Sequence, residues 1–272
     1  MNVLALCAGV GGLELGVKLA NPTARCVCYV EGEAYAASIL VKRMEEKALD
    51  EAPIWSDVRS FDGKPWRGKV DCITGGYPCQ PFSLAGARKG KDDPRHLWPS
   101  IKRIIGEIQP KVCFFENVAG HVSLGLETVL NDLQGMGYKV ATGLFSAEEV
   151  GATNERNRLF IMGNTESGIS NVPDVFKTFG INQKTLSRPQ QVQNREFGRR
   201  CGDTSLFPPE FGKLSDWRCV PENLKPAILG VDDGASHWVD RMRCNGNGVV
   251  PLAASYAWRV LQDCLQMEPV SI

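Results

Sequence analysis

The feature that most constrains the fold is an alternation of short apolar runs with amphipathic stretches over residues 1–164. Short apolar runs bounded by turn residues are typical of buried strands, and amphipathic stretches between them are typical of crossover helices. The alternation therefore predicts an α/β sheet. We expect strands at Val3–Cys7, Cys26–Glu31, Val70–Thr74, Lys111–Glu116, Lys139–Phe145 and Leu159–Met162, and helices at Leu13–Leu19, Ala34–Lys47, Trp98–Ile108 and Leu126–Gly135.

The ends of these strands carry residues suited to ligand binding. Four candidate strands end at or just before Gly9, Glu31, Gly75 and Asn117. In an open α/β sheet, ligands bind beyond the carboxyl ends of the strands. The sequence therefore predicts a ligand site along this edge.

The composition changes after Met162. Residues from about 163 to 233 are rich in Gly, Pro, Asn and Gln and have little helical periodicity, which predicts a small, loop-rich unit. Basic residues outnumber acidic ones between Lys177 and Lys225, an excess that could contact phosphates or simply be solvated. We expect three regions, at 1–164, 165–235 and 236–272, and a final helix over Ala253–Gln266.

Global composition gives little indication of a partner. The chain has 31 Lys and Arg against 31 Asp and Glu, so any basic surface must be local. Its ten cysteines show no CxxC pair, and His96, His121 and His237 have no metal or triad spacing, so we expect no metal and no role for these histidines. Apolar runs are too short to cross a bilayer and no signal peptide is recognised, so we expect a cytoplasmic protein with reduced thiols.

A glycine-rich segment, Ala8-Gly9-Val10-Gly11-Gly12, follows the first strand and opens the first helix. A dinucleotide fingerprint requires G-x-G-x-x-G, whereas Glu14 stands five positions after Gly9, which argues against an NAD-dependent dehydrogenase. Glu31 can accept hydrogen bonds from both hydroxyls of a ribose. Asp57-Val58 could cap and cover an adenine, although each acid could equally be solvated. Together these residues predict an adenosyl cofactor other than NAD.

One cysteine differs from the other nine in its surroundings. Cys79 lies in Gly75-Gly76-Tyr77-Pro78-Cys79-Gln80-Pro81-Phe82-Ser83, where two glycines and two prolines predict a sharp, rigid loop at a strand end. A buried structural cysteine needs no such frame, and a metal ligand would need partners that are not nearby. We therefore predict that Cys79 is a nucleophile.

These motifs, taken in order, resemble those of the DNA cytosine-5 methyltransferase family. The resemblance covers residues 1–164 and about 240–266. It implies a Rossmann-like, S-adenosylmethionine-dependent methyltransferase sheet, with 165–235 as a small target-recognition domain and 236–272 returning to the catalytic domain. The matching segments are Val3–Gly12, Glu31, Asp57, Pro78-Cys79-Gln80, Glu116-Asn117-Val118, Asn154-Glu155-Arg156-Asn157-Arg158 and Gly246-Asn247-Gly248-Val249-Val250-Pro251.

The resemblance implies covalent chemistry on cytosine. Cys79 would add to C6 of the base, and Glu116, kept protonated by a poorly solvated site, would donate to N3. Asn117 would help to place the Glu116 backbone and the Cys79 loop. Arg158 would contact cytosine O2 and the neighbouring phosphate, and Arg156 would orient the site. The target base must be flipped out of the duplex for this reaction.

The resemblance also implies the cofactor and the partners. S-adenosyl-L-methionine would be the methyl donor and double-stranded DNA the substrate of a monomeric enzyme that contacts no membrane, in a prokaryotic or phage-infected cell. A cognate restriction endonuclease is left open. The residues expected to bind the cofactor are Ala8, Gly9, Gly11, Gly12, Leu13, Glu31, Asp57, Val58, Gly76, Pro78, Asn247 and Val249.

The chain departs from the family pattern at a few positions. Cys7 and Gly32 stand where the family often has aromatic residues that pack on the adenine, and Asn154 replaces a Gln. Ser83 stands where family members that act on transfer RNA usually have Thr, which favours DNA over the tRNA alternative.

An alternative from another class is a methyltransferase-derived nucleic-acid-binding protein without catalysis. The loss of Cys79, Glu116 or Arg158 would indicate such a protein. All three residues are present, so the sequence favours the enzyme.

Overall fold

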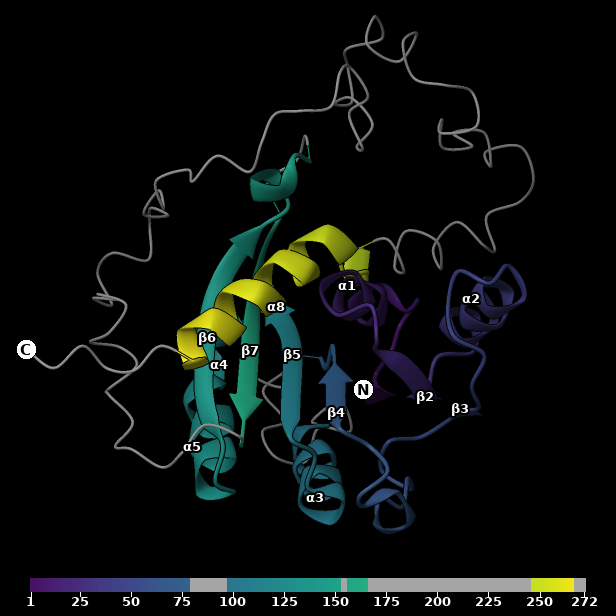
Figure 1. Ribbon diagram of the computed structural model, residues 1–272, viewed down its shortest axis with the longest axis horizontal. Coiled ribbons are helices and arrows are strands. Elements are labelled where there is room, and N and C mark those ends of the chain that lie inside the picture. Colours follow the sequence, from purple (N-terminus) through teal and green to yellow (C-terminus); the bar gives the residue numbers. More distant parts are fainter. Residues whose placement is uncertain (79–96, 153–155, 166–245, 267–272) are drawn as a thin grey trace, which may run out of the picture.

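A seven-stranded mixed sheet forms the centre of the protein (Figure 1). The computed structural model describes residues 1–78, 97–152, 156–165 and 246–266. The predicted nucleophile Cys79, together with Asn154 and almost all of the region 165–235, lies outside the described residues.

The strands are ordered β3-β2-β1-β4-β5-β7-β6 across the sheet. Neighbours from β3 to β5 run parallel, and β7 runs antiparallel to both β5 and β6. The strands are β1 (Asn2–Leu6), β2 (Arg25–Val30), β3 (Ile54–Trp55), β4 (Cys72–Gly75), β5 (Val112–Val118), β6 (Lys139–Ser146) and β7 (Asn157–Asn164).

Helices lie on both faces of this sheet, so most side chains of the central strands are buried and apolar, and the polar exceptions lie towards the carboxyl ends of β4 and β5. Helices α3 and α5 pack on one face, whereas α1, α2 and α8 pack on the other. The helices are α1 (Gly12–Ala20), α2 (Ala34–Glu45), α3 (Trp98–Ile108), α4 (His121–Leu124), α5 (Leu126–Gly135) and α8 (Pro251–Gln266), with 3₁₀ turns η1 (Lys64–Trp66) and η3 (Glu148–Val150).

The strand order reverses at β1, and this reversal determines where a ligand can bind. Strands β2 and β3 lie on one side of β1 and β4 and β5 on the other. The loops that follow β1 and β4 therefore diverge and leave a crevice beyond the strand ends.

Helix α8, the last described element, packs against α1, the first helix of the chain (Figure 1). Glycines allow this close approach. A Cβ added to Gly16 would lie 2.5 Å from Ala254 Cβ, and one added to Gly12 would lie 2.5 Å from the Val249 carbonyl oxygen. The Val249 backbone therefore lies directly against Gly12, at the end of the glycine-rich segment.

The predicted elements correspond closely to the observed ones. Every predicted strand and helix is present, with ends displaced by at most a few residues. Two short elements are not predictable from the sequence pattern: β3, whose two residues are too few to show a period, and the single-turn helix α4.

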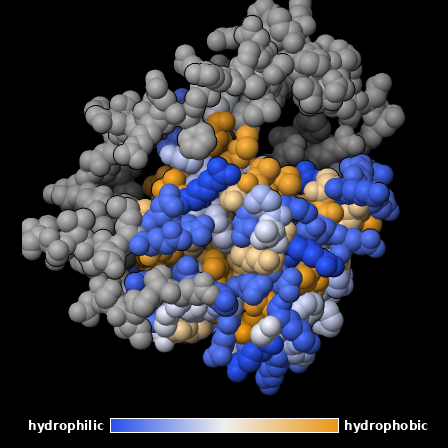
Figure 2. Space-filling view, in the orientation of Figure 1, coloured by the Kyte–Doolittle hydropathy of each residue, from blue (hydrophilic) through white to orange (hydrophobic). Residues whose placement is uncertain are grey.

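The visible surface is largely polar (Figure 2). Hydrophilic side chains cover α2 and the lower end of α3, and hydrophobic ones show in small groups between them. No helix among the described residues is long and apolar enough to cross a membrane.

Candidate active site

A cavity of about 440 Å³ lies at the carboxyl edge of the sheet. It is bordered by the loop after β1, the residues after β2, the residues after β4 and the end of β5. This is the edge where the sequence predicts a ligand site. Its volume is within the range of roughly 300–1,000 Å³ that is usual for small-molecule pockets.

Most of the residues expected to bind the cofactor line this cavity. Those that do are Ala8, Gly9, Gly12, Leu13, Glu31, Asp57, Val58, Gly76, Pro78, Asn247 and Val249. Lining residues that the sequence analysis did not nominate for the cofactor are Cys7, Val10, Val30, Gly32, Glu33, Ala36, Ser56, Arg59, Leu97, Gly248 and the expected catalytic residue Glu116.

Gly11 is the exception, since it does not line the cavity. It has φ 80° and precedes α1 at its N-cap, and its N–H donates to the Ala8 carbonyl over 2.9 Å. A Cβ at this position would lie 2.5 Å from Leu49 Cδ1. Gly11 is therefore required by the turn and by packing under the loop rather than by contact with the cavity.

Glu31 lies at the end of β2 with its carboxylate held by the backbone. Gly9 N–H donates to Oε2 over 2.7 Å, and Glu33 N–H donates to Oε1 over 2.7 Å. Burial raises the pKa of this carboxyl, although the two amide donors oppose that shift. Each oxygen has further lone pairs, so the carboxylate can also accept hydrogen bonds from a ligand in the cavity.

Asp57 already has a partner of its own. The Arg59 Nε donates to Asp57 Oδ1 over 2.9 Å, and Arg59 N–H donates to the same oxygen over 2.9 Å. These contacts lower the pKa of the Asp57 carboxyl. Arg59 also lines the cavity, so a cation stands beside the expected adenine contact.

Glu116 and Arg158 form a buried ion pair between neighbouring strands β5 and β7. The Arg158 Nε lies 2.9 Å from Glu116 Oε1, and the Glu116 side chain is only 8% exposed. Desolvation raises the pKa of Glu116 to about 7, although Arg158 and Arg156 oppose the shift. Burial therefore favours the protonated form of this carboxyl, and the two arginines favour the ionised form.

Glu116 also lies next to the residues that precede Cys79. A Cβ built on Gly76 would lie 3.6 Å from Glu116 Oε2 and 3.8 Å from the Cys7 carbonyl oxygen. Gly76 therefore runs between the glycine-rich loop and the carboxyl group. Pro78, the last described residue before Cys79, lines the same cavity.

Arg156 holds the C-terminal segment at the cavity. Its Nη2 donates to the carbonyl oxygens of Gly246, over 2.6 Å, and Gly248, over 2.7 Å. Asn247 and Val249 line the cavity on the same stretch of chain. The guanidinium thus holds the stretch of chain that forms one wall of the cavity.

Asn117 and His121 both reach the chain before Cys79. Asn117 Nδ2 donates to the Tyr77 carbonyl oxygen over 3.0 Å. His121 Nε2 lies 3.0 Å from the Tyr77 hydroxyl in a buried hydrogen bond. The sequence analysis gave His121 no role, because its partner lies 44 residues away and no motif joins the two.

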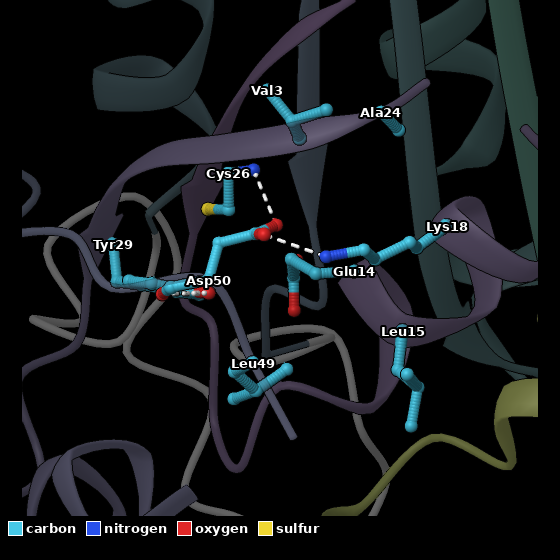
Figure 3. Close-up of a pocket in the computed structure, with 9 residues that line it drawn as sticks. All are labelled: Val3, Glu14, Leu15, Lys18, Ala24, Cys26, Tyr29, Leu49 and Asp50. Carbon is cyan, nitrogen blue, oxygen red and sulfur yellow. Dashed lines mark hydrogen bonds and ion pairs between the residues drawn. The ribbon is translucent and has the colours of Figure 1, made fainter. Parts of the chain in front are cut away.

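A second buried carboxyl, Glu14, lies on α1 outside the large cavity (Figure 3). Thr74 Oγ1 donates to Glu14 Oε1 over 2.8 Å, and Glu14 Oε2 has no hydrogen-bond partner among the described residues. Burial raises its pKa to about 7. Glu14 lines an internal space of about 10 Å³ beside Lys18 and Asp50, which is room for about one water molecule.

The six described cysteines are poor candidates for a nucleophile. Burial raises the pKa of every one of them, to about 12 for Cys7 and Cys113 and about 11 for Cys28. A thiol with a raised pKa supplies little thiolate near neutral pH. No group of metal-ligating side chains is assembled in the described part of the chain.

Comparison with known proteins identifies the family. The family model described as C-5 cytosine-specific DNA methylase matches residues 1–210. The chain therefore belongs to the C-5 cytosine-specific DNA methylase family, as the sequence motifs indicate.

Curated relatives are similar over part of their length. The chain is 33% identical to type II methyltransferase M.HgiBI of Herpetosiphon aurantiacus over 163 residues, which are 58% of this chain and 36% of that protein. It is 33% identical to type II methyltransferase M1.ScrFI of Lactococcus lactis subsp. cremoris over 189 residues, 68% of this chain and 46% of that protein. The chain thus matches between about a third and a half of the length of these relatives.

Solved structures agree on the fold. The crystal structure of S. pombe Dnmt2 methyltransferase superposes with a TM-score of 0.61 at 18% identity, covering 98% of this chain and 100% of that one. The Entamoeba histolytica methyltransferase EhMeth gives a TM-score of 0.51 at 22% identity, covering 62% of this chain and 55% of that one. The expected Rossmann-like methyltransferase fold is confirmed.

Proposed function

We propose that this chain is a DNA cytosine-C5 methyltransferase that acts on a flipped-out cytosine in a specific duplex sequence through a covalent Cys79 adduct. One observation carries the proposal. Glu116, which is paired with Arg158, borders the same cavity as the glycine-rich loop and Pro78, the residue before Cys79. An acid, a cofactor loop and the origin of the nucleophile loop therefore meet at one place.

The cavity fits S-adenosyl-L-methionine in both volume and chemistry. Bound there, this cofactor would supply an electrophilic methyl group on its sulfonium. Glu31, oriented by two backbone amides, would accept hydrogen bonds from the ribose hydroxyls. Asp57 and Val58 would border the adenine, and Arg59 would neutralise the Asp57 charge beside it. Asn247 and Val249 would close the cavity from the C-terminal side.

Cys79 is assigned as the nucleophile. Its thiolate would add to cytosine C6, which makes C5 electron-rich enough to accept a methyl group. A base would then remove the C5 proton, and the thiolate would leave from C6. The raised pKa values of the six described cysteines support this assignment, because none of those thiols ionises readily.

Glu116 is assigned as the acid that donates a proton to cytosine N3. Burial raises the pKa of this carboxyl to about 7, which favours its protonated form. A donor with a pKa near the working pH is well matched to proton transfer. Arg158 would contact cytosine O2 and the neighbouring phosphate while its charge stabilises the carboxylate formed by the transfer.

Asn117 and Arg156 would place these groups without reacting. Asn117 ties the β5 end to the backbone of Tyr77, two residues before Cys79. Arg156 ties β7 to the segment that carries Asn247.

The proposal extends to the chain's organisation and partners. Residues 1–164 and 236–272 would form the catalytic and cofactor-binding part, which is supported by the packing of α8 against α1. Residues 165–235 would form the target-recognition domain on double-stranded DNA. The enzyme would act as a monomer in the cytoplasm of a prokaryotic or phage-infected cell, where a cognate restriction endonuclease could accompany it.

Bisulfite sequencing of DNA and RNA from cells that express the chain tests this function. Cells expressing Cys79→Ser provide the control. We expect 5-methylcytosine in one DNA sequence context with the native chain and none with the variant. Methylation confined to transfer RNA would favour the tRNA alternative, and no methylation of either would favour a protein that binds without catalysis.

A further inference from the structure

Tyr77 is the residue from which the nucleophile loop departs, and its phenol is held in the protein interior. It follows Gly76 at the end of β4 and precedes Pro78 and Cys79. Its hydroxyl lies 3.0 Å from His121 Nε2, and the two residues are only 4% and 3% exposed. This buried polar contact joins the end of β4 to α4.

Tyr77 is therefore held from both of its ends. Asn117 binds its carbonyl oxygen over 3.0 Å, while His121 binds its hydroxyl. The ring between them packs at 5.4 Å from the Trp98 ring and edge-on at 6.0 Å from the Phe115 ring. Backbone, ring and hydroxyl are thus all restricted.

We propose that His121 is a positioning residue for the methyl transfer, which fixes the departure point of the nucleophile loop through its hydrogen bond to Tyr77. The inference rests on the proposed function, because it concerns the approach of Cys79 to the base. Glu116, Asn117 and His121 lie within six residues at the end of β5. This short segment would thereby fix the position of the Glu116 carboxyl relative to the start of the loop that carries Cys79.

The hydrogen bond between Tyr77 and His121 depends on orientation, whereas apolar packing does not. An apolar pair of similar shape would fill the same space, but it would leave the ring free to shift along its packing surface. A buried hydrogen bond between neutral groups is worth only about 1 kcal/mol of stability. A displacement of about 1 Å in a reacting group, in contrast, can slow a reaction on the order of 100-fold.

The contact is also constant over the pH range of an assay. Burial lowers the pKa of His121 to about 4, so the imidazole remains neutral in neutral solution. The pair therefore acts as a fixed support, and its removal is expected to change rates without adding a new pH dependence.

Four variants test the inference. Tyr77→Phe and His121→Leu remove the hydrogen bond, and His121→Gln keeps a polar partner. Tyr138→Phe is the matched control, because Tyr138 is equally buried and its hydroxyl donates over 2.7 Å to the Pro110 carbonyl, a contact outside the cavity. Unfolding in denaturant measures the stability lost by each variant.

The kinetic readout is a single-turnover rate of adduct formation at Cys79, measured on duplex DNA with 5-fluorocytosine in the context that bisulfite sequencing identifies. We expect Tyr77→Phe and His121→Leu to slow this rate about 10- to 100-fold. The dissociation constant of S-adenosylmethionine and the KM for DNA should stay within about twofold. His121→Gln should recover most of the rate, and Tyr138→Phe should keep the native rate despite a similar loss of stability.

Native rates in Tyr77→Phe and His121→Leu would overturn the inference. A second measurement covers the case in which the native chain forms no adduct, so that the proposed function itself fails. The rate of Cys79 alkylation by iodoacetamide, mapped by mass spectrometry without DNA, should change in Tyr77→Phe and His121→Leu but not in Tyr138→Phe. If Cys79 reacted at the same rate in the native chain and in all of these variants, the positioning role would be overturned, whether or not the chain methylates DNA.

Discussion

Glu14 and Glu116 are both buried carboxyls, and burial raises the pKa of each to about 7. Their surroundings nevertheless differ. Glu116 faces the 440 Å³ cavity and has Arg158 as a cationic partner at 2.9 Å. Glu14 faces a space for about one water molecule (Figure 3). Its carboxyl accepts a hydrogen bond from the neutral hydroxyl of Thr74.

The comparison shows that a raised pKa does not by itself identify a catalytic acid. A perturbed pKa marks a functional candidate only when the group can also reach a reactant. Glu116 can deliver a proton into the cavity, and Arg158 can stabilise the carboxylate that remains. Glu14 has no access to that cavity, so we expect it to affect stability rather than chemistry.

The largest expected difference between the two carboxyls is in turnover. Glu116→Gln removes the donated proton and should lower kcat by about 10²- to 10⁴-fold while S-adenosylmethionine still binds. Glu14→Gln should stay within about threefold of the native kcat. Methyl transfer from radiolabelled cofactor to duplex DNA measures both. Similar losses of kcat in the two variants would contradict the assignment of Glu116, rather than Glu14, as the catalytic acid.

The dependence of kcat/KM on pH separates the two groups further. If protonated Glu116 is the productive form, kcat/KM should fall about tenfold per pH unit as the pH rises above about 7. Glu14→Gln should keep this falling limb, whereas the residual activity of Glu116→Gln should lack it. If the fall in kcat/KM above pH 7 disappeared in Glu14→Gln and persisted in Glu116→Gln, the titrating group would be Glu14 and not Glu116.

The smallest expected effect is the contribution of Glu14 to stability. A carboxyl with a pKa near 7 in the folded state, against about 4.3 when unfolded, holds a proton that the unfolded chain has lost. The free energy of unfolding should therefore fall as the pH rises from about 4.5 to 7, by up to about 3 kcal/mol for Glu14. Glu14→Gln should reduce the difference in unfolding free energy between pH 5 and pH 8 by a similar amount.

Denaturant unfolding at the two pH values measures this effect. Glu127→Gln is a suitable control, because Glu127 is exposed on α5 and should leave the difference unchanged. An unchanged difference in Glu14→Gln would mean that Glu14 ionises in the folded protein as readily as in the unfolded chain.

The fold and the frame of the site could be predicted from sequence because both depend on local patterns. Buried strands appear as apolar runs, and parallel strands bring their carboxyl ends to one edge. Glu31 and Glu116 could therefore be placed at the same cavity from their positions at strand ends. Cys79 lies outside the described residues and stays a prediction.

Contacts between distant segments could not be predicted in this way. The bond between Tyr77 and His121, and the bond between Glu14 and Thr74, each join residues that only the sheet order brings together. In the sequence, Glu14 is notable only because it stands where a dinucleotide-binding motif would have a glycine. Its burial depends on which face of α1 packs against the sheet. Gly11 shows the converse, since a motif glycine expected at the cofactor faces Leu49 instead.

The most direct test of the account is the site of covalent attachment to DNA. Native chain would be incubated with S-adenosylmethionine and a duplex that carries 5-fluorocytosine at the target position, where fluorine blocks the release step. Mass spectrometry of the digested adduct should locate the base on Cys79, with no adduct in Cys79→Ser. Attachment at another cysteine, or no attachment by a chain that methylates DNA, would contradict the proposed mechanism.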